Sequence, residues 1–213
     1  MELIERCGND TIELFGDTGT GKTTFVLKVL EELPAEKKLY IDTERNLLKE
    51  PEFAEYKYIP DFQELYHYIM NLPDGYKAVV IDSVGLPILG EFATMRLDEK
   101  GQILLKMEAI SYALKRYSYK NDAVVIVTNQ PESEFGKEKG HILRPFGDKS
   151  KYYYKEICKS ELMYSSPTKT VCNIKSFRSR FFGRDAPLYR LTVTSNDVKL
   201  ERLYSDVNDI NKS

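Results

Sequence analysis

This chain has few of the residues that build disulfide frameworks or imidazole-based metal sites. Its 213 residues include three cysteines and two histidines, at Cys7, Cys158, Cys172, His67 and His141. An odd, sparse set of cysteines without a C-x-x-C pair argues against a disulfide scaffold and against a zinc site. The composition therefore disfavours the small disulfide-rich class and the zinc-binding class of protein.

Long apolar runs and a leader-like N-terminus are also missing. No stretch approaches the ~18 consecutive apolar residues of a membrane-spanning helix. Residues 1–5 are partly acidic, unlike the start of a signal peptide. We therefore expect a cytoplasmic protein. The absence of tryptophan, the three glutamines and the many lysines and glutamates lean towards a thermophilic source.

An excess of charge of one sign is missing overall, but the charge is unevenly distributed. Residues 1–148 carry 18 basic and 26 acidic side chains, for a net charge of −8, whereas residues 149–190 carry 10 and 3, for +7. The basic stretch is also aromatic, with rings at Tyr152, Tyr153, Tyr154, Tyr164, Phe177, Phe181, Phe182 and Tyr189. Cations interleaved with rings suit single-stranded nucleic acid, although such rings are as often strand and core residues.

A glycine-rich motif of the form G-x-x-x-x-G-K-T is the most informative feature present. It comprises Gly16, Asp17, Thr18, Gly19, Thr20, Gly21, Lys22 and Thr23, and Thr24 follows it. A strand-like run precedes it and a helix-like run follows, which is the context of a phosphate-binding loop. The loop N–H groups and the helix N-terminus would bind ATP phosphates, with Lys22 on the β- and γ-phosphates and Thr23 on Mg²⁺. The alternative is a glycine-rich turn with a chance lysine.

Strand-like and helix-like segments alternate through the first two thirds of the chain. The expected strands lie at 11–15, 38–42, 78–82 and 123–128, and the expected helices at 24–30, 62–72 and 102–119. Asp61 is a plausible N-cap for the second of these helices. Strands this apolar, alternating with helices, indicate a buried parallel sheet in an α/β fold.

The pattern changes near residue 151. Strand-like stretches separated by turn residues lie at 152–162, 169–177, 188–194 and 198–203. They predict antiparallel hairpins that extend the sheet. We expect residues 1–213 to form one domain, with residues 131–149 as its longest loop.

Polar side chains follow three of the expected parallel strands, and carboxyl ends of such strands gather ligands. Asp82 suits a second Mg²⁺ ligand, with a helix N-cap as the alternative. Glu44 could activate a water for hydrolysis, although spacing alone makes it a surface acid. Gln130 could bond the γ-phosphate and report its loss to the following loop, or simply be a polar strand end.

Together these motifs resemble the RecA/RadA recombinase family. The resemblance rests on YIDTE at 40–44, IDS at 81–83, VIVTNQ at 125–130 and GDK at 147–149, and spans roughly residues 8–204. It implies a RecA-like P-loop NTPase core with a mostly parallel sheet, flanking helices and C-terminal hairpins. It also implies that Glu44 is the catalytic base, that Lys22 serves catalysis, that Gln130 senses the γ-phosphate, and that ATP and Mg²⁺ are the cofactors.

The chain looks most like a short archaeal RadA paralogue of the RadB kind. We expect no separate N-terminal DNA-binding domain. Arg45 stands where recombinases usually have glycine, and the first DNA loop, expected between Gly85 and Gly101, is not convincingly basic. The resemblance implies a slow ATPase that binds single-stranded DNA and modulates homologous recombination or repair, with a RadA-type recombinase as a partner. The expected DNA contacts are Lys137, Lys139, Arg144, Lys149 and Lys151.

One further element resembles a motif of the KaiC-like branch of these ATPases. There, a Lys-x-x-Arg element reaches the γ-phosphate of a neighbouring subunit, and Lys175 and Arg178 have this spacing. A solvated basic hairpin or a DNA contact explains Arg178 equally well. Two other functions stay open: a KaiC-like signalling ATPase, and a regulator that docks on a partner and holds ATP structurally without binding DNA.

Overall fold

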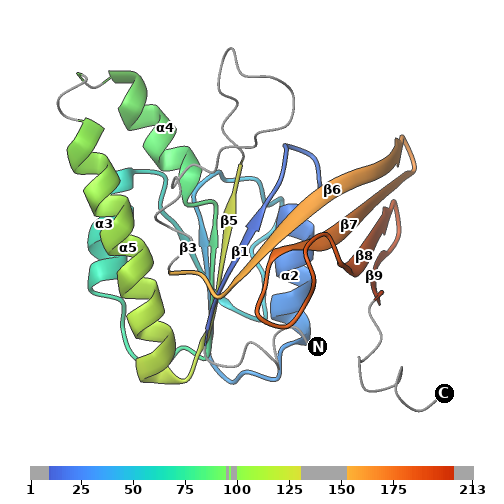
Figure 1. Ribbon diagram of the computed structural model, residues 1–213, viewed down its shortest axis with the longest axis horizontal. Helices are drawn as coiled ribbons and strands as arrows, with labels where there is room; N and C mark the ends of the chain where they lie inside the picture. Colours follow the sequence, from blue (N-terminus) through green and yellow to red (C-terminus); the bar gives the residue numbers. More distant parts are fainter. Residues whose placement is uncertain (1–9, 95, 97–99, 131–152, 204–213) are drawn as a thin grey trace.

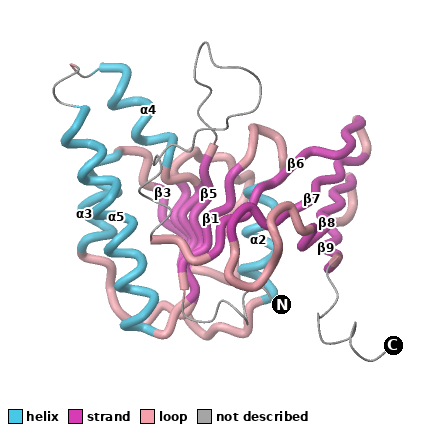
Figure 2. The backbone as a smooth tube through the Cα atoms, in the orientation of Figure 1, coloured by secondary structure: helices cyan, strands magenta, loops and turns pink. Residues whose placement is uncertain are grey.

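A nine-stranded sheet organises the described part of the chain (Figures 1 and 2). The computed structural model describes residues 10–94, 96, 100–130 and 153–203. The strands are ordered β3-β2-β4-β5-β1-β6-β7-β8-β9. The first five of these pair in parallel, β6 joins β1 in parallel, and β6 to β9 pair antiparallel. The expected architecture, a mostly parallel sheet with C-terminal antiparallel hairpins, is confirmed.

The five parallel strands are mostly apolar in sequence, except for β3 at the sheet edge. Their bounds are β1 (Thr11–Phe15), β2 (Lys38–Asp42), β3 (Glu55–Tyr58), β4 (Ala78–Asp82) and β5 (Val124–Asn129). All of them except β3 are buried along their whole length, as strands covered on both faces must be.

Helices cover the two faces of this sheet unequally (Figure 1). The helices are α2 (Lys22–Glu32), α3 (Phe62–Met70), α4 (Gly85–Thr94) and α5 (Lys100–Asn121). Side chains of α3, α4 and α5 join one hydrophobic cluster, whereas α2 packs in a second cluster with strand residues from β7 and β8. Among the described helices, α2 alone packs on the second face, and the glycine-rich motif leads directly into it.

The antiparallel extension consists of β6 (Glu156–Ser166), β7 (Lys169–Arg178), β8 (Pro187–Thr194) and β9 (Val198–Arg202). The long β6–β7 hairpin projects from the body of the molecule (Figure 1). The first of these strands begins four residues later than expected, because Tyr153 and Tyr154 instead pack on α5. The Tyr153 ring packs edge-on against the Tyr112 ring, and the Tyr154 hydroxyl oxygen lies 3.2 Å from the Ser111 hydroxyl oxygen.

Two elements correct the sequence interpretation. Residues 85–94, expected to belong to a DNA-binding loop, form the helix α4, so that expectation is wrong for these residues. Pro87 lies in the first turn of α4, where proline is compatible with a helix. Strand β3 was not expected at all, because its four residues are partly exposed at the sheet edge. Asp61 does cap α3, accepting a 2.8 Å hydrogen bond from the Glu64 N–H.

The described helices include none that is both long and apolar enough to cross a lipid bilayer.

Candidate phosphate-binding site

A pocket of about 310 Å³ opens at the carboxyl ends of the parallel strands. It gathers residues from the glycine-rich loop and the start of α2, from the end of β4, from the segments after β2 and β5, and from β7 and β8. They are Thr18, Gly19, Gly21, Lys22, Thr23, Thr24, Glu44, Asn46, Asp82, Gln130, Thr170 and Val193. Residues that the sequence suggested separately are thus brought to one place, as parallel strands ending at one edge require.

The glycines of the loop are needed for its shape. Gly19 and Gly21 both have φ of +79°, a conformation that side chains rarely adopt. At Gly16 an added Cβ would lie 2.5 Å from the Ser160 carbonyl oxygen. Ser160, on β6, also donates a 2.6 Å hydrogen bond from its hydroxyl to the Thr20 carbonyl. Strand β6 of the antiparallel extension therefore packs against the glycine-rich loop and supports it.

The ammonium group of Lys22 lies within the loop. It donates to the carbonyl oxygens of Gly16 at 2.8 Å and Asp17 at 2.9 Å. Burial lowers the pKa of Lys22, while the nearby carboxylates of Asp82, Glu44 and Asp17 oppose that shift. An anion beside Lys22 would favour its charged form further, so the group is suited to meet a phosphate.

Asp82 is the last residue of β4, and its carboxylate accepts hydrogen bonds from two buried hydroxyl groups. Tyr40, on β2, donates to Oδ2 at 2.7 Å, and Thr128, on β5, donates to Oδ1. Burial and the adjacent Asp82 raise the pKa of Tyr40 far above its ordinary value, so Tyr40 remains a donor. Each Asp82 oxygen keeps a lone pair for a ligand. The alternative of a helix N-cap has no support in these contacts.

Glu44 follows β2 in a short turn built on Asp42. One oxygen of Asp42 accepts from the N–H groups of Glu44 at 2.9 Å and Arg45 at 2.8 Å, and the other accepts from the Tyr56 hydroxyl at 3.0 Å. Arg45 adopts φ of +56°, which explains why glycine suits this position. The Glu44 carboxylate accepts from Ser83 and from Asn46, each at 2.7 Å.

Hydrogen bonds join the segments at the ends of β2 and β4, next to Glu44. The Thr43 N–H donates to the Asp82 carbonyl at 2.9 Å, and the Thr43 hydroxyl donates to the Ser83 carbonyl at 2.7 Å. The Ser83 N–H returns a 2.9 Å bond to the Thr43 hydroxyl oxygen. These bonds fix the distance between the two strand ends that carry Glu44 and Asp82.

Gln130 lines the same pocket as Glu44, on the segment after β5. Its Oε1 accepts a 3.4 Å hydrogen bond from the Thr18 hydroxyl in the glycine-rich loop. The preceding Asn129 is buried and donates to Glu13 of β1 at 2.9 Å. Gln130 therefore contacts the phosphate loop directly, while the loop that it was expected to signal to, residues 131–149, lies outside the described residues.

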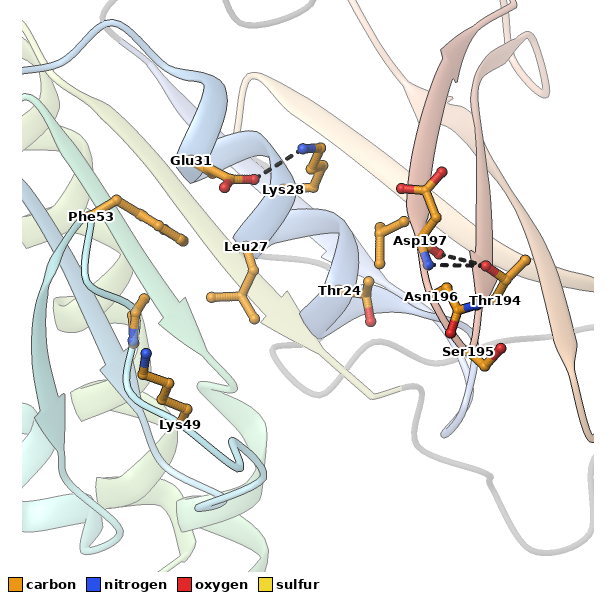
Figure 3. A pocket seen from close by; sticks show the side chains of 12 residues that line it. Thr24, Leu27, Lys28, Glu31, Lys49, Phe53, Thr194, Ser195, Asn196 and Asp197 are labelled. Atoms are coloured by element: carbon orange, nitrogen blue, oxygen red, sulfur yellow. Dashed lines mark hydrogen bonds and ion pairs between the residues drawn. The ribbon is translucent and has the colours of Figure 1, made fainter.

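A second pocket, of about 530 Å³, adjoins the first at Thr24 (Figure 3). The helix α2 forms one wall with Leu27, and the turn after β8 forms another with Ser195 and Asn196. Phe53 and Lys49 lie across from that turn (Figure 3). Leu27, Pro51, Phe53 and Val198 give this pocket apolar surface, and its eight other lining residues supply polar groups that a small organic ligand could bond.

The residues expected to contact DNA, which are Lys137, Lys139, Arg144, Lys149 and Lys151, lie outside the described residues. Arg178 is exposed at the end of β7, where its backbone pairs with that of Ile157 on β6. It does not line the phosphate pocket of its own chain.

Part of the charge of the basic stretch is neutralised by acids, one of which, Asp10, lies outside residues 149–190. Lys159 and Lys175 both pair with Glu161 at 2.6 Å, and Lys155 pairs with Asp10 at 2.7 Å. Several rings of this region are core residues: Tyr154 and Tyr189 are buried, and Phe177 packs edge-on against Phe15. The exposed rings of the described hairpins include Tyr164 and Phe181.

Comparison with known proteins gives a consistent picture of the fold. A family model described as an AAA domain matches residues 9–103, which hold the glycine-rich loop, Glu44 and Asp82. The solved structure of the RadB recombinase is similar with a TM-score of 0.67 and 20% identity, over 90% of each chain. A search of curated proteins found no match. The chain thus has a RecA-like P-loop fold, as the sequence motifs predicted.

Proposed function

We propose that this protein binds ATP with Mg²⁺ and hydrolyses it, and that turnover serves single-stranded DNA binding in recombination or repair. The observation that carries the proposal is the convergence of Lys22, Thr23, Glu44, Asp82 and Gln130 on one pocket at the strand ends. That pocket meets the larger one at Thr24. The first is suited to a triphosphate, and the second to its base and ribose.

The donor set fits Mg²⁺, which prefers hard oxygen ligands and is commonly held by few protein groups together with substrate phosphates. The Thr23 hydroxyl and the Asp82 carboxylate line the same pocket and would hold the ion. The ion would supply charge neutralisation at the β- and γ-phosphates. Tyr40 and Thr128 keep the Asp82 carboxylate oriented for this role through their hydrogen bonds.

The remaining residues have roles that follow from their positions. Lys22 would exchange its two carbonyl partners for phosphate oxygens and stabilise the charge that develops on them. Glu44 would orient a water and accept its proton. Gln130, next to Thr18, would bond the γ-phosphate and respond to its loss.

The DNA part of the proposal rests on the excess of basic residues in 149–190, on exposed Tyr164 and Phe181, and on the likeness to a structure named a recombinase. The lysines paired with acids favour the alternative, in which the hairpins meet a protein. That protein would be a RadA-type recombinase. In a KaiC-like signalling ATPase it would be a neighbouring subunit, and Arg178 would reach the γ-phosphate of the ATP bound there.

The test is ATP turnover with and without single-stranded DNA, beside a Glu44→Gln variant. Turnover that DNA stimulates and that Glu44→Gln abolishes would support the whole proposal. Turnover that is insensitive to DNA would support the KaiC-like or partner-docking alternative. An absence of turnover, with ATP still bound, would contradict the enzymatic part and leave ATP as a structural ligand.

A further inference from the structure

The carboxylate of Glu44 is held on both of its oxygens. Its Oε1 accepts from the Ser83 hydroxyl and its Oε2 accepts from the Asn46 side-chain amide, at 2.7 Å each. A carboxylate only accepts hydrogen bonds, so the nitrogen of the Asn46 amide must face it. Asn46 also lines the phosphate pocket. The two donors form a clamp on Glu44, and we use that name for the pair Ser83 and Asn46.

The local backbone delivers Asn46 to this place. Asp42 accepts from the N–H groups of Glu44 and Arg45, and Arg45 takes the left-handed conformation. The chain therefore reverses within the turn, and Asn46 returns beside Glu44. Asp42 is itself held by the Tyr56 hydroxyl, and the Tyr56 ring stacks on Tyr40 with centroids 6.3 Å apart.

The clamp restrains Glu44 without occupying it fully. A glutamate side chain has several rotatable bonds and, unrestrained, would point at the pocket only part of the time. Each carboxylate oxygen has two lone pairs, so one donor on each oxygen leaves one lone pair on each for a water. A base held in the attacking geometry gains rate through orientation, and small displacements are costly.

We propose that Asn46 is a positioning residue that holds the Glu44 carboxylate at the phosphate pocket, opposite Ser83. This inference rests on the proposed role of Glu44 as the base. Asn46 is the cleaner of the two donors to test. The Ser83 hydroxyl also accepts from the Leu86 N–H, at 3.4 Å, at the start of α4. The Asn46 side chain, among the described residues, bonds to Glu44 alone.

The experiment compares steady-state ATP turnover of the wild type with Asn46→Ala, Asn46→Gln and Leu48→Ala. We expect Asn46→Ala to lower kcat about ten- to a hundredfold while KM for ATP changes less than about twofold. Asn46→Gln keeps an amide donor and should recover much of the loss. Leu48 lies in the same loop and is fully exposed, at 107%, so Leu48→Ala should leave turnover unchanged.

A second comparison separates this inference from the proposed function. In a Glu44→Gln background, adding Asn46→Ala should leave any residual turnover unchanged, because the carboxylate that Asn46 positions is gone. Wild-type turnover that survives Glu44→Gln would contradict the proposed function. Turnover that is lost in Glu44→Gln but unchanged in Asn46→Ala would overturn this inference alone. An equal loss of turnover in Leu48→Ala would also overturn it. So would a rise in KM with kcat unchanged in Asn46→Ala, provided that this variant and the wild type have equal urea unfolding midpoints.

Discussion

The phosphate pocket and the antiparallel hairpins are both rich in charged residues, but they use these residues differently. At the pocket, the carboxylates of Asp82 and Glu44 are held by neutral donors such as Tyr40 and Ser83. In the hairpins, lysines are held by acids: Lys159 and Lys175 share Glu161. The pocket therefore keeps the charge of its groups available for a ligand, while the hairpins cancel part of theirs.

The difference shows what a count of charges can and cannot say. Residues 149–190 have a net charge of +7, which suggested a nucleic-acid face. The count includes Lys155, whose partner Asp10 lies just before β1, far away in the sequence. A local excess of lysine is therefore a weaker indication of a binding surface than a motif whose backbone geometry is fixed.

The largest effect should follow from breaking the pocket at Asp82. Asp82→Asn keeps the size of the side chain but turns a donor towards Tyr40 or Thr128. We expect turnover to fall about a hundredfold or more, and the free energy of unfolding to fall by about 1–3 kcal/mol. Steady-state kinetics and urea unfolding measure both. Asp74→Asn, which removes an exposed partner of Lys120, is the matched control; equal turnover in the two variants would contradict the assignment.

The hairpin side of the comparison can be sharpened at Glu161. Glu161→Gln would release Lys159 and Lys175 together, so we expect tighter binding of single-stranded DNA. The plot of log affinity against log salt should become steeper by about 1–1.5. Fluorescence anisotropy over a salt series measures this. Glu64→Gln makes the same change of net charge on α3, so an equal response from both variants would mean that the hairpins do not contact DNA.

Glu156 tests how the hairpins are joined to the core. This carboxyl is buried on β6, its Oε1 accepts from the Arg180 N–H at 3.1 Å, and burial raises its pKa. A raised pKa in the folded state means that the native protein favours the protonated form, so stability is lost as pH rises through that pKa. Glutamine does not ionise, so Glu156→Gln should not lose stability in this way as the pH rises.

We therefore expect Glu156→Gln to be more stable than the wild type by about 1 kcal/mol at pH 8, with the difference shrinking towards pH 4. Urea unfolding at pH 4.5, 6 and 8 provides the measurement. A difference that is absent at pH 8, or that grows as pH falls, would show that the burial of Glu156 does not limit stability.

The smallest effect should come from Arg45, in the turn that carries Glu44. Its φ of +56° favours glycine, so Arg45→Gly should stabilise the protein by up to ~1 kcal/mol. The gain is reduced by loss of the contact between Arg45 and the Tyr58 ring, 5.6 Å from the guanidinium carbon. Arg45→Ala keeps the backbone strain and loses the contact. Thermal unfolding that does not distinguish Arg45→Gly from Arg45→Ala would contradict this account.

Much of the fold could be predicted because it depends on local patterns. The buried strands β1, β2 and β4 have the bounds that their apolar runs indicated. The edge strand β3 is half-exposed and lacks such a run, and α4 begins with glycine and has a proline in its first turn. These two elements depend on their neighbours for stability, and a single sequence does not display that dependence.

The site could be predicted only in outline. The loop motif and the family resemblance named Lys22, Glu44 and Asp82, which the structure brings to one pocket. Their catalytic roles remain predictions. The groups that hold them, such as Tyr40 and Asn46, were not predicted. Tyr40 lies within an apolar strand and Asn46 within a polar turn, so each resembles an ordinary residue until the strand ends are placed together.

The most direct test of the central claim is calorimetric titration of a non-hydrolysable ATP analogue, with Mg²⁺, into the wild type and Lys22→Ala. Lys120→Ala, which removes an exposed lysine on α5, is the control. The account predicts that the analogue binds the wild type and Lys120→Ala equally well. Binding to Lys22→Ala should be about ten- to a hundredfold weaker, because this variant loses its charged phosphate contact. Equal affinity for all three proteins would contradict a phosphate site on the glycine-rich loop.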